Sequence, residues 1–189
     1  MNAAVRSIVV ETSGTLESRE FVRQLSGHGL RTTVVADTRS AISALSAAAS
    51  DSSAVCYVHA RVAELAPDAG LTVDLFADLR SLASEFPRLV DTLKGLPSPH
   101  AVFVGSDAAW GQTANPALAS YAAWTFALAR NMDLIASGSV LGNAIVGRRL
   151  DQPWATRPSA DLVSWLLDQP VGGQEFDVSA PRTIGVLRW

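Results

Sequence analysis

The chain has 189 residues, of which 48% are hydrophobic, and its mean hydropathy is +0.20. This length suits one well-buried domain better than two, so we expect residues 1–189 to form a single domain. The formal net charge is −3 and the sequence has no basic cluster, which argues against nucleic acid and anionic membranes as partners.

The N-terminal segment, MNAAVRSIVVETSG, has the pattern of a strand and meets a glycine turn before a long apolar run can form. It therefore does not resemble a signal peptide, and no apolar run in the sequence approaches the length of a membrane span. A cytoplasmic location is expected. The one cysteine, Cys56, lies in the apolar run AVCYV and is expected to be a buried, unreactive thiol rather than a nucleophile.

The first half of the chain alternates strand patterns with helix patterns, which is typical of a parallel sheet. Asp37 is the first residue of one of the helix patterns and suits the role of its N-cap. Strands are expected at 5–10, 31–36 and 53–60, and helices at 16–29 and 37–49. Strands joined through helices imply right-handed crossovers, so the predicted fold class is α/β.

The second half continues with a long helix pattern over 71–95, which Pro87 should kink or divide. A strand at 100–105 and a helix at about 116–133 follow. Residues 133–147 have the pattern of a short strand that enters a glycine-spaced loop. The last predicted elements are a helix at 159–170 with Ser159 as its N-cap and an edge strand at 174–180.

Residues 107–130, DAAWGQTANPALASYAAWTFALAR, follow the predicted strand AVFVG and contain a tyrosine on a long helix pattern. This stretch resembles the short-chain dehydrogenase/reductase family, in which a serine at a strand end precedes Tyr-x-x-x-Lys on a helix. Tyr121 takes the tyrosine position, but Thr125 stands where the lysine is expected. Asp107 takes the serine position if one residue is inserted relative to the family spacing, and Ser106 takes it if two are inserted.

The resemblance implies a Rossmann-like, doubly wound parallel sheet in three αβα layers. One element of the family is missing, because the chain passes from the helix at 37–49 directly to the strand that normally carries Asn-Asn-Ala-Gly. In the 3-2-1-4-5 order of a Rossmann sheet the missing strand is the outer one. We therefore expect a sheet that is one edge strand–helix unit shorter than the family norm.

The residues that would hold a nicotinamide cofactor are also replaced. Alignment with the family places its three phosphate-binding glycines at Thr12, Leu16 and Ser18. The Asn-Asn-Ala-Gly position is occupied by residues 58–61, Val-His-Ala-Arg. Arg61 is interpreted either as a replacement for a lost positive charge or, more simply, as a solvated arginine. The family's lysine lowers the tyrosine pKa and holds the nicotinamide ribose, and Thr125 does neither. We expect that the chain binds no NAD(P).

Two residue sets that suggest other ligands have simpler explanations. Asp37 lies where NAD-preferring relatives carry the acid that binds the adenosine ribose, but without the glycines we favour its role as a helix cap. The three histidines, His28, His59 and His100, lie on different predicted elements without nearby cysteines or paired acids. No metal site is therefore expected.

The first functional hypothesis is a non-catalytic structural or regulatory subunit of an oligomer of the short-chain dehydrogenase/reductase type. The chain would pair with itself or with an active family member through the helices at 71–95 and 116–133, because the tyrosine-bearing helix of the family forms its main subunit contact. Aromatic residues and methionine suit interface cores. The apolar residues assigned to this contact are Trp124, Phe126, Leu128, Met132, Leu75, Phe76, Leu79, Leu82, Phe86 and Leu89.

The alternative hypothesis is a cofactor-independent cyclase, dehydratase or isomerase of specialised metabolism that acts on a small apolar or oxygenated metabolite. Tyr121, Asp107 and His59 would be its acid/base set. Trp110 and Trp154, in the predicted loops at 105–116 and 138–158, would cover the ligand. The competing explanation is structural: Asp107 caps a turn, His59 is a hydrogen-bonded histidine at a strand end, and Tyr121 is a packing residue.

Overall fold

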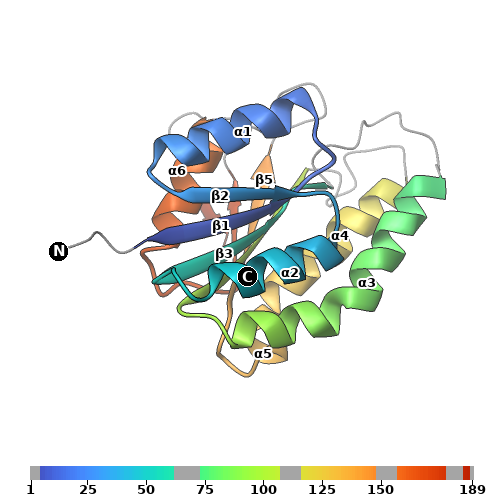
Figure 1. The fold of residues 1–189 in the computed structure, drawn as a ribbon. Helices are drawn as coiled ribbons and strands as arrows, with labels where there is room; N and C mark the ends of the chain where they lie inside the picture. The colour runs from blue at the N-terminus through green and yellow to red at the C-terminus, as the bar shows by residue number, and fades with distance from the viewer. Residues whose placement is uncertain (1–4, 62–72, 107–115, 148–156, 178–184, 188–189) are drawn as a thin grey trace.

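The computed structural model describes residues 5–61, 73–106, 116–147, 157–177 and 185–187 (Figure 1). The strands are β1 (Arg6–Glu11), β2 (Arg31–Val35), β3 (Ala54–His59), β4 (Pro99–Ser106), β5 (Leu141–Gly147), β6 (Gln174–Asp177) and β7 (Gly185–Leu187). The helices are α1 (Leu16–Gly27), α2 (Thr38–Ala48), α3 (Val73–Lys94), α4 (Pro116–Arg130), α5 (Met132–Ile135) and α6 (Arg157–Leu166).

The strands form one sheet in the order β2-β1-β3-β4-β5-β6-β7, and every neighbouring pair is parallel except β6 with β7. Helices α1 and α6 cover one face, while α2, α3 and α4 cover the other (Figure 1). The predicted α/β, three-layer fold is confirmed. So is the shortened edge, because α2 leads directly into β3 and β2 is the outermost strand of this sheet.

The core has two halves because side chains alternate between the two faces of each strand. All six residues of β3 are buried, as expected for a central parallel strand covered on both sides. Cys56 and Val58 pack toward α1 and α6, whereas Val55 and Tyr57 pack toward α2, α3 and α4. The same alternation sends His59 to the Tyr57 side of the sheet.

The prediction for residues 133–147 is wrong in its order of elements. The single-turn helix α5 comes first, a turn follows, and the strand β5 comes last. Ser137 and Gly138 form the turn with positive φ angles of 55° and 77°. The strand follows the glycine turn because the run from Leu141 pairs with β4 and is largely buried there.

Pro87 does not divide the helix that contains it, since α3 continues from Val73 to Lys94. The proline ring lies on the exposed side of α3, while Phe86 and Leu89 beside it are buried in the core. Loss of one backbone hydrogen bond is offset by the packing of this face. Within the described part of the chain, no helix combines the length and the apolar character that crossing a membrane requires.

Candidate functional site

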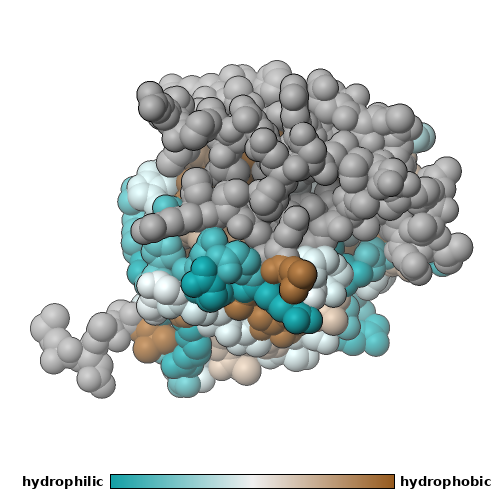
Figure 2. Space-filling model, turned by 90° about the horizontal axis from the view of Figure 1, so that it is seen from above, coloured by the Kyte–Doolittle hydropathy of each residue, from teal (hydrophilic) through white to brown (hydrophobic). Residues whose placement is uncertain are grey.

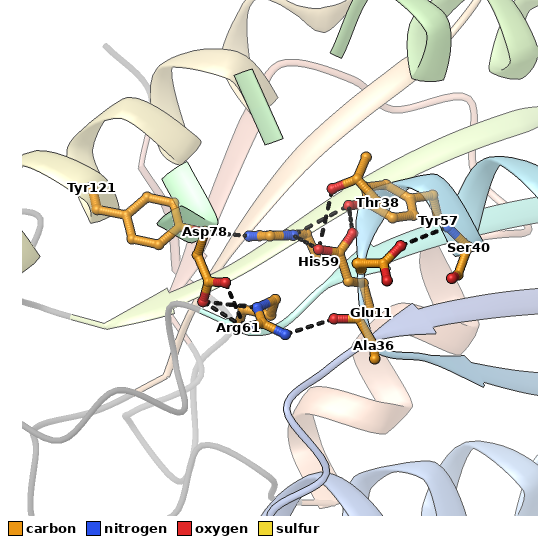
Figure 3. A network of polar contacts seen from close by, with 10 residues as sticks. Glu11, Ala36, Thr38, Ser40, Tyr57, His59, Arg61, Asp78 and Tyr121 are labelled. Carbon is orange, nitrogen blue, oxygen red and sulfur yellow. Dashed lines mark hydrogen bonds and ion pairs between the residues drawn. The ribbon is translucent and has the colours of Figure 1, made fainter. Parts of the chain in front are cut away.

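The candidate site lies at the carboxyl ends of β1 and β3, the neighbouring strands whose next connections run in opposite directions. Open α/β sheets bind ligands at such a switch point. The strand register sets Glu11 beside His59. Tyr57 is two residues before His59 on the same face, and α4 brings Tyr121 to the other side of the imidazole (Figure 3).

Five side chains are joined there in what we call the Glu11 network: Glu11, Thr38, Tyr57, His59 and Tyr121. Tyr57 Oη donates to Glu11 Oε2 over 2.6 Å, and Thr38 Oγ1 donates to Glu11 Oε1 over 3.2 Å. His59 Nδ1 lies 3.2 Å from Tyr57 Oη, and His59 Nε2 lies 3.3 Å from Tyr121 Oη. Each ring nitrogen of His59 therefore has a phenol as its partner.

Glu11 accepts hydrogen bonds at one end of the network. An ionised carboxylate only accepts, so Tyr57 must donate to it, and the Tyr57 oxygen is left to accept the proton of His59 Nδ1. On the other side of the ring, His59 Nε2 lies within hydrogen-bonding distance of Tyr121 Oη. His59 Nδ1 also lies 3.6 Å from Glu11 Oε1, so this side of the ring faces the carboxylate as well as the Tyr57 oxygen.

The pKa values agree with this arrangement. Burial raises the pKa of Glu11, but the charge of His59 and hydrogen bonds from His59, Tyr57 and Thr38 more than offset it, so the net pKa is lowered. Burial, followed by the Glu11 charge, raises the pKa of Tyr57 well above its ordinary value. Burial, followed by the charges of Asp78 and Glu11, also raises the pKa of Tyr121. Both phenols therefore keep their protons at physiological pH.

The network belongs to the packed core. His59 and Tyr121 each have 0% exposed surface. The His59 ring centroid lies 5.8 Å from that of Phe103, and Tyr57 meets the same phenylalanine edge-on at 6.1 Å. Every polar atom of the phenols and the imidazole is consequently used inside the protein.

The structure brings together two of the three residues proposed for acid/base chemistry, His59 and Tyr121. The third, Asp107, lies outside the described residues, and so do Trp110 and Trp154. Ser106 ends β4, but its side chain is not among those described. Glu11 and Tyr57 were not predicted as site residues. Two features of the sequence could have indicated them: Glu11 stands at the end of a buried strand, and Tyr57 is two residues before His59, which places both on the same face of a strand.

Thr125, at the position of the family's lysine, is 1% exposed and bonds within its own helix. Its Oγ1 donates to the carbonyl of Ala122 over 2.9 Å. The charge of Arg61 acts to lower the pKa of Tyr121, but it is the smallest of the influences on that group and burial outweighs it. No residue of α4 itself supplies a cation beside the Tyr121 hydroxyl in the manner of the family's lysine.

Arg61 is not the solvated arginine that the sequence suggested. Its side chain is only 19% exposed and forms an ion pair with Asp78 of α3. Arg61 Nε and Nη2 donate to the Asp78 carboxylate over 3.0 and 2.6 Å, and Nη1 donates to the Ala36 carbonyl over 2.6 Å (Figure 3). The guanidinium thus links the end of β3 to α3 and to the residue that follows β2, because its donors find acceptors on both sides.

The turn between β1 and α1 is closed by its own side chains. Thr12 Oγ1 accepts from the backbone N–H of Gly14 over 3.1 Å, and Thr15 Oγ1 caps α1 by accepting from Ser18 N over 3.2 Å. Leu16 begins the helix with 81% of its surface exposed. At the next helix, Asp37 accepts from Ser40 N over 2.8 Å, which confirms its predicted role as an N-cap. That hydrogen bond lowers the Asp37 pKa.

Most of the apolar side chains assigned to a subunit contact pack inside this chain. Phe126, Met132, Leu82, Phe86 and Leu89 are buried in the core between α2, α3, α4 and the sheet. Trp124, Leu79 and Leu128 are partly buried against the same core, and Trp124 lies 6.5 Å from Phe86 between ring centroids. The side chains of Leu75 and Phe76 lie outside the described set. Oligomerisation through these helices stays a prediction.

The other reactive side chains are separate from the Glu11 network. Cys56 is 1% exposed, and burial raises the pKa of its thiol far above the ordinary value, which fits the predicted unreactive cysteine. His28 pairs with Asp161 over 2.9 Å, and His100 is buried at the start of β4. Across the ranges that the structure describes, no three histidine, cysteine or acidic side chains are grouped as a metal site would require.

No known family model and no curated protein matches the chain. Solved structures do match. A 3-alpha-hydroxysteroid dehydrogenase from a Pseudomonas species, complexed with NADH, has a TM-score of 0.64 at 17% identity over 92% of this chain and 94% of that chain. A 3-ketoacyl-(acyl-carrier-protein) reductase from Brucella melitensis, complexed with NADH, has 0.64 at 13% identity over 95% and 98%.

A short-chain dehydrogenase from Mycobacterium smegmatis also matches, with a TM-score of 0.59 at 17% identity over 95% of this chain and 94% of that chain. At such identities the likeness concerns the arrangement of the backbone. The chain therefore has a Rossmann-like fold of the kind found in short-chain dehydrogenases and reductases.

Proposed function

We propose that the chain is a protein of short-chain dehydrogenase/reductase fold that does not bind NAD(P) and serves as a non-catalytic structural or regulatory subunit of an oligomer of that type. The observation that carries this proposal is the hydrogen bond between Tyr121 Oη and His59 Nε2. A catalytic phenol has to contact its substrate. Here the hydroxyl is buried and bonds to an imidazole of the core.

The first turn of the sheet supports the absence of a dinucleotide. A pyrophosphate at a helix N-terminus needs backbone N–H groups that are ready to donate to it. The N–H groups of Gly14 and Ser18 instead donate to the threonine side chains of the same turn. The ionised Glu11 carboxylate, directly before this turn, would also repel the diphosphate. The residues present do not fit the cofactor.

The Arg61 ion pair supports the same conclusion. It crosses the carboxyl edge of the sheet from β3 to α3, with a further bond to Ala36 after β2. Ligands of open α/β sheets enter at this edge. A cofactor there would have to break a largely buried ion pair, and breaking such a pair is costly unless the ligand replaces both partners.

Titration with NAD⁺, NADH, NADP⁺ and NADPH tests the cofactor half of the proposal. We expect no heat of binding by calorimetry and no rise in melting temperature with any of the four, while an active short-chain dehydrogenase run in parallel responds. A ligand that binds only the folded state raises stability by about 2.7 kcal/mol at a hundredfold excess over Kd, so micromolar binding would be plainly visible. Such binding would refute the proposal and make an oxidoreductase the better assignment.

The subunit half of the proposal rests on Trp124, a partly buried aromatic residue on α4 of the kind that anchors protein interfaces. Affinity purification of the tagged chain from its native host should recover a second short-chain dehydrogenase/reductase subunit, and Trp124→Ala should weaken that recovery. Trp165→Ala, at a half-exposed tryptophan on α6, is the matched control. Recovery of the tagged chain alone would count against a heteromeric role.

A second candidate function, cofactor-independent acid/base catalysis, is favoured by the continuous chain of hydrogen-bonding contacts in the Glu11 network. They connect the Tyr121 hydroxyl to a carboxylate through His59. If Tyr121 is a proton donor, Tyr121→Phe should reduce turnover of a substrate found by screening small carbonyl compounds by about a hundredfold or more. An unchanged rate in this variant would remove Tyr121 from the mechanism.

A further inference from the structure

The strand β2 lies at one edge of the sheet. It pairs with β1 on one side, and within the described ranges no strand lies beyond it. The Val35 carbonyl accepts from Thr12 N over 3.0 Å, so Val35 directs its backbone groups toward β1. Because this direction alternates along a strand, Arg31 and Thr33 also face β1. Thr32 and Val34 direct their N–H and C=O groups outward, away from the sheet.

This edge has few of the features that keep an edge strand from pairing. Soluble proteins protect such strands with proline, bulges, inward charges or a covering element. Residues 32–35, Thr-Thr-Val-Val, include no proline and no charge, and their register with β1 has no bulge. Val34 is 50% exposed. In Figure 1 β2 is the front edge of the sheet, between α1 above and α2 below.

The neighbouring face over α1 is less suited to binding a partner than the β2 edge is. In Figure 2 its described surface is mainly hydrophilic, and the hydrophobic side chains there are scattered instead of forming one patch. Charged residues of α1 pair with each other, as Arg23 does with Glu20. The β2 edge therefore combines outward-facing backbone groups with exposed apolar surface better than this neighbouring face does.

We infer that β2 pairs in antiparallel orientation with β2 of a second copy of the chain, with the two-fold axis at Thr33. In this register Thr32 of one copy lies opposite Val34 of the other. The two outward-facing residues of each strand then exchange both of their backbone hydrogen bonds with the partner strand. The carbonyls at the next outward positions, Leu30 and Ala36, already accept from Thr32 Oγ1 and Arg61.

The side chains fit the same register. Thr33 meets Thr33 of the partner subunit across the axis, and threonine pairs are favourable across antiparallel strands. Val34, the exposed apolar residue, is covered by the partner's Thr32. Arg31, the one charged residue of the strand, lies opposite the partner's Val35, so no like charges face each other. The strand is thus complementary to itself, which identifies a second copy as the partner.

Charges placed on the two-fold axis test this inference directly. We expect the wild type to dimerise with increasing concentration in analytical ultracentrifugation. Thr33→Lys alone and Thr33→Glu alone should each raise the dissociation constant about tenfold or more, because like charges then face each other. Mixing the two variants should restore a dimer that contains one of each. Ser81→Lys, on the exposed side of α3, should leave the dimer unchanged.

A cysteine at the axis is a second, independent test. Cα atoms of a non-hydrogen-bonded antiparallel pair lie about 4.5 Å apart, which a disulfide can bridge. Thr33→Cys should therefore form a covalent dimer on mild oxidation, whereas Ser81→Cys should not. A wild type that stays monomeric at all concentrations, or a dimer that Thr33→Lys leaves intact, would overturn the inference. Neither result bears on cofactor binding or on the α3 and α4 contact.

Discussion

At the level of single residues, the Glu11 network is a polar cluster in the core whose members are hydrogen-bond partners of one another. The carboxylate has two hydroxyl donors, and the imidazole has one phenol at each nitrogen. Buried polar groups stabilise a fold only when their hydrogen bonds are complete, because an unpaired group retains its desolvation cost. Loss of any one member should therefore cost more than its own contact.

Replacing Glu11 by glutamine should lower stability at neutral pH by about 1–3 kcal/mol, because the amide cannot match an ionised acceptor for two hydroxyl groups. The folded-state pKa of Glu11 lies below its ordinary value. The stabilisation from its charge is therefore fully present above the unfolded pKa and is lost as the pH falls through the folded pKa. Thermal unfolding at a series of pH values from neutral to acidic measures this effect.

In that series the melting temperatures of wild type and Glu11→Gln should differ most near neutral pH and converge in acid. Asp91→Asn, at an exposed carboxylate on α3, serves as the control and should stay close to wild type throughout. A gap between Glu11→Gln and wild type that is the same at every pH would contradict the assignment of an ionised Glu11.

The contact between His59 and Tyr121 could be predicted because each residue has a recognisable position in a family-like motif. Glu11 and Tyr57 were beyond the reach of that reasoning. Glu11 meets the network through the pairing of β1 with β3, two strands that are neighbours in space with β2 between them in sequence. Arg61 was misread for the same reason, since its partner Asp78 belongs to a later helix.

At the level of elements, glycines set how closely α4 approaches the sheet. A Cβ atom on Gly142 of β5 would overlap the Ala129 carbonyl and Met132 Cβ. A Cβ atom on Gly105 of β4 would come within 2.6 Å of Phe126 Cζ. The two nearest neighbours of a Cβ atom on Gly142 are a backbone oxygen and a Cβ atom, which cannot turn aside as the end of a flexible side chain can.

Gly142→Ala should therefore destabilise the protein by about 1–3 kcal/mol, the usual cost of overpacking a core. Gly27→Ala is the matched control, since a Cβ atom there would meet nothing within 4 Å. It should be neutral or stabilising by about 0.4–1 kcal/mol, because alanine restricts the unfolded chain more than glycine does. Urea denaturation of both variants measures the difference, and equal stabilities would disprove the close contact of α4 with β5.

Elements with a long, regular pattern were predicted well, as were the strands that are apolar throughout. The failure at 133–147 arose where a short apolar run preceded a glycine, because such a run suits a strand or a single helical turn equally. In the structure this run is the single helical turn α5, which is followed by the positive φ angles of Ser137 and Gly138. The effect of Pro87 on the continuity of α3 was overestimated, because the packing of the whole helix outweighs one missing backbone hydrogen bond.

At the level of the whole molecule, the alternation of strands and helices determines the doubly wound sheet and leaves β2 at its edge. Amide hydrogen exchange should follow this plan. Amides of the interior strands β1, β3 and β4 should exchange most slowly, because they open only with the sheet as a whole. Within β2, at low protein concentration, Thr33 and Val35 should be protected, while Thr32 and Val34 should exchange rapidly.

Residue-resolved exchange by NMR checks this pattern. Equal protection along β2 in the dilute protein would contradict the assigned direction of its backbone groups. Raising the concentration should slow exchange at Thr32 and Val34 without changing Thr33, if these two amides bind the edge of another copy.

The reactivity of the buried cysteine can be used to measure global unfolding of this chain. Cys56 lies in the central strand β3, with 1% of its surface exposed and a thiol that burial keeps protonated. A thiol-specific dye can reach it only when the sheet opens, so the labelling rate of the unmodified protein counts unfolding events. The same shielding leaves a cysteine introduced at a surface position as the one thiol that reacts in the folded state.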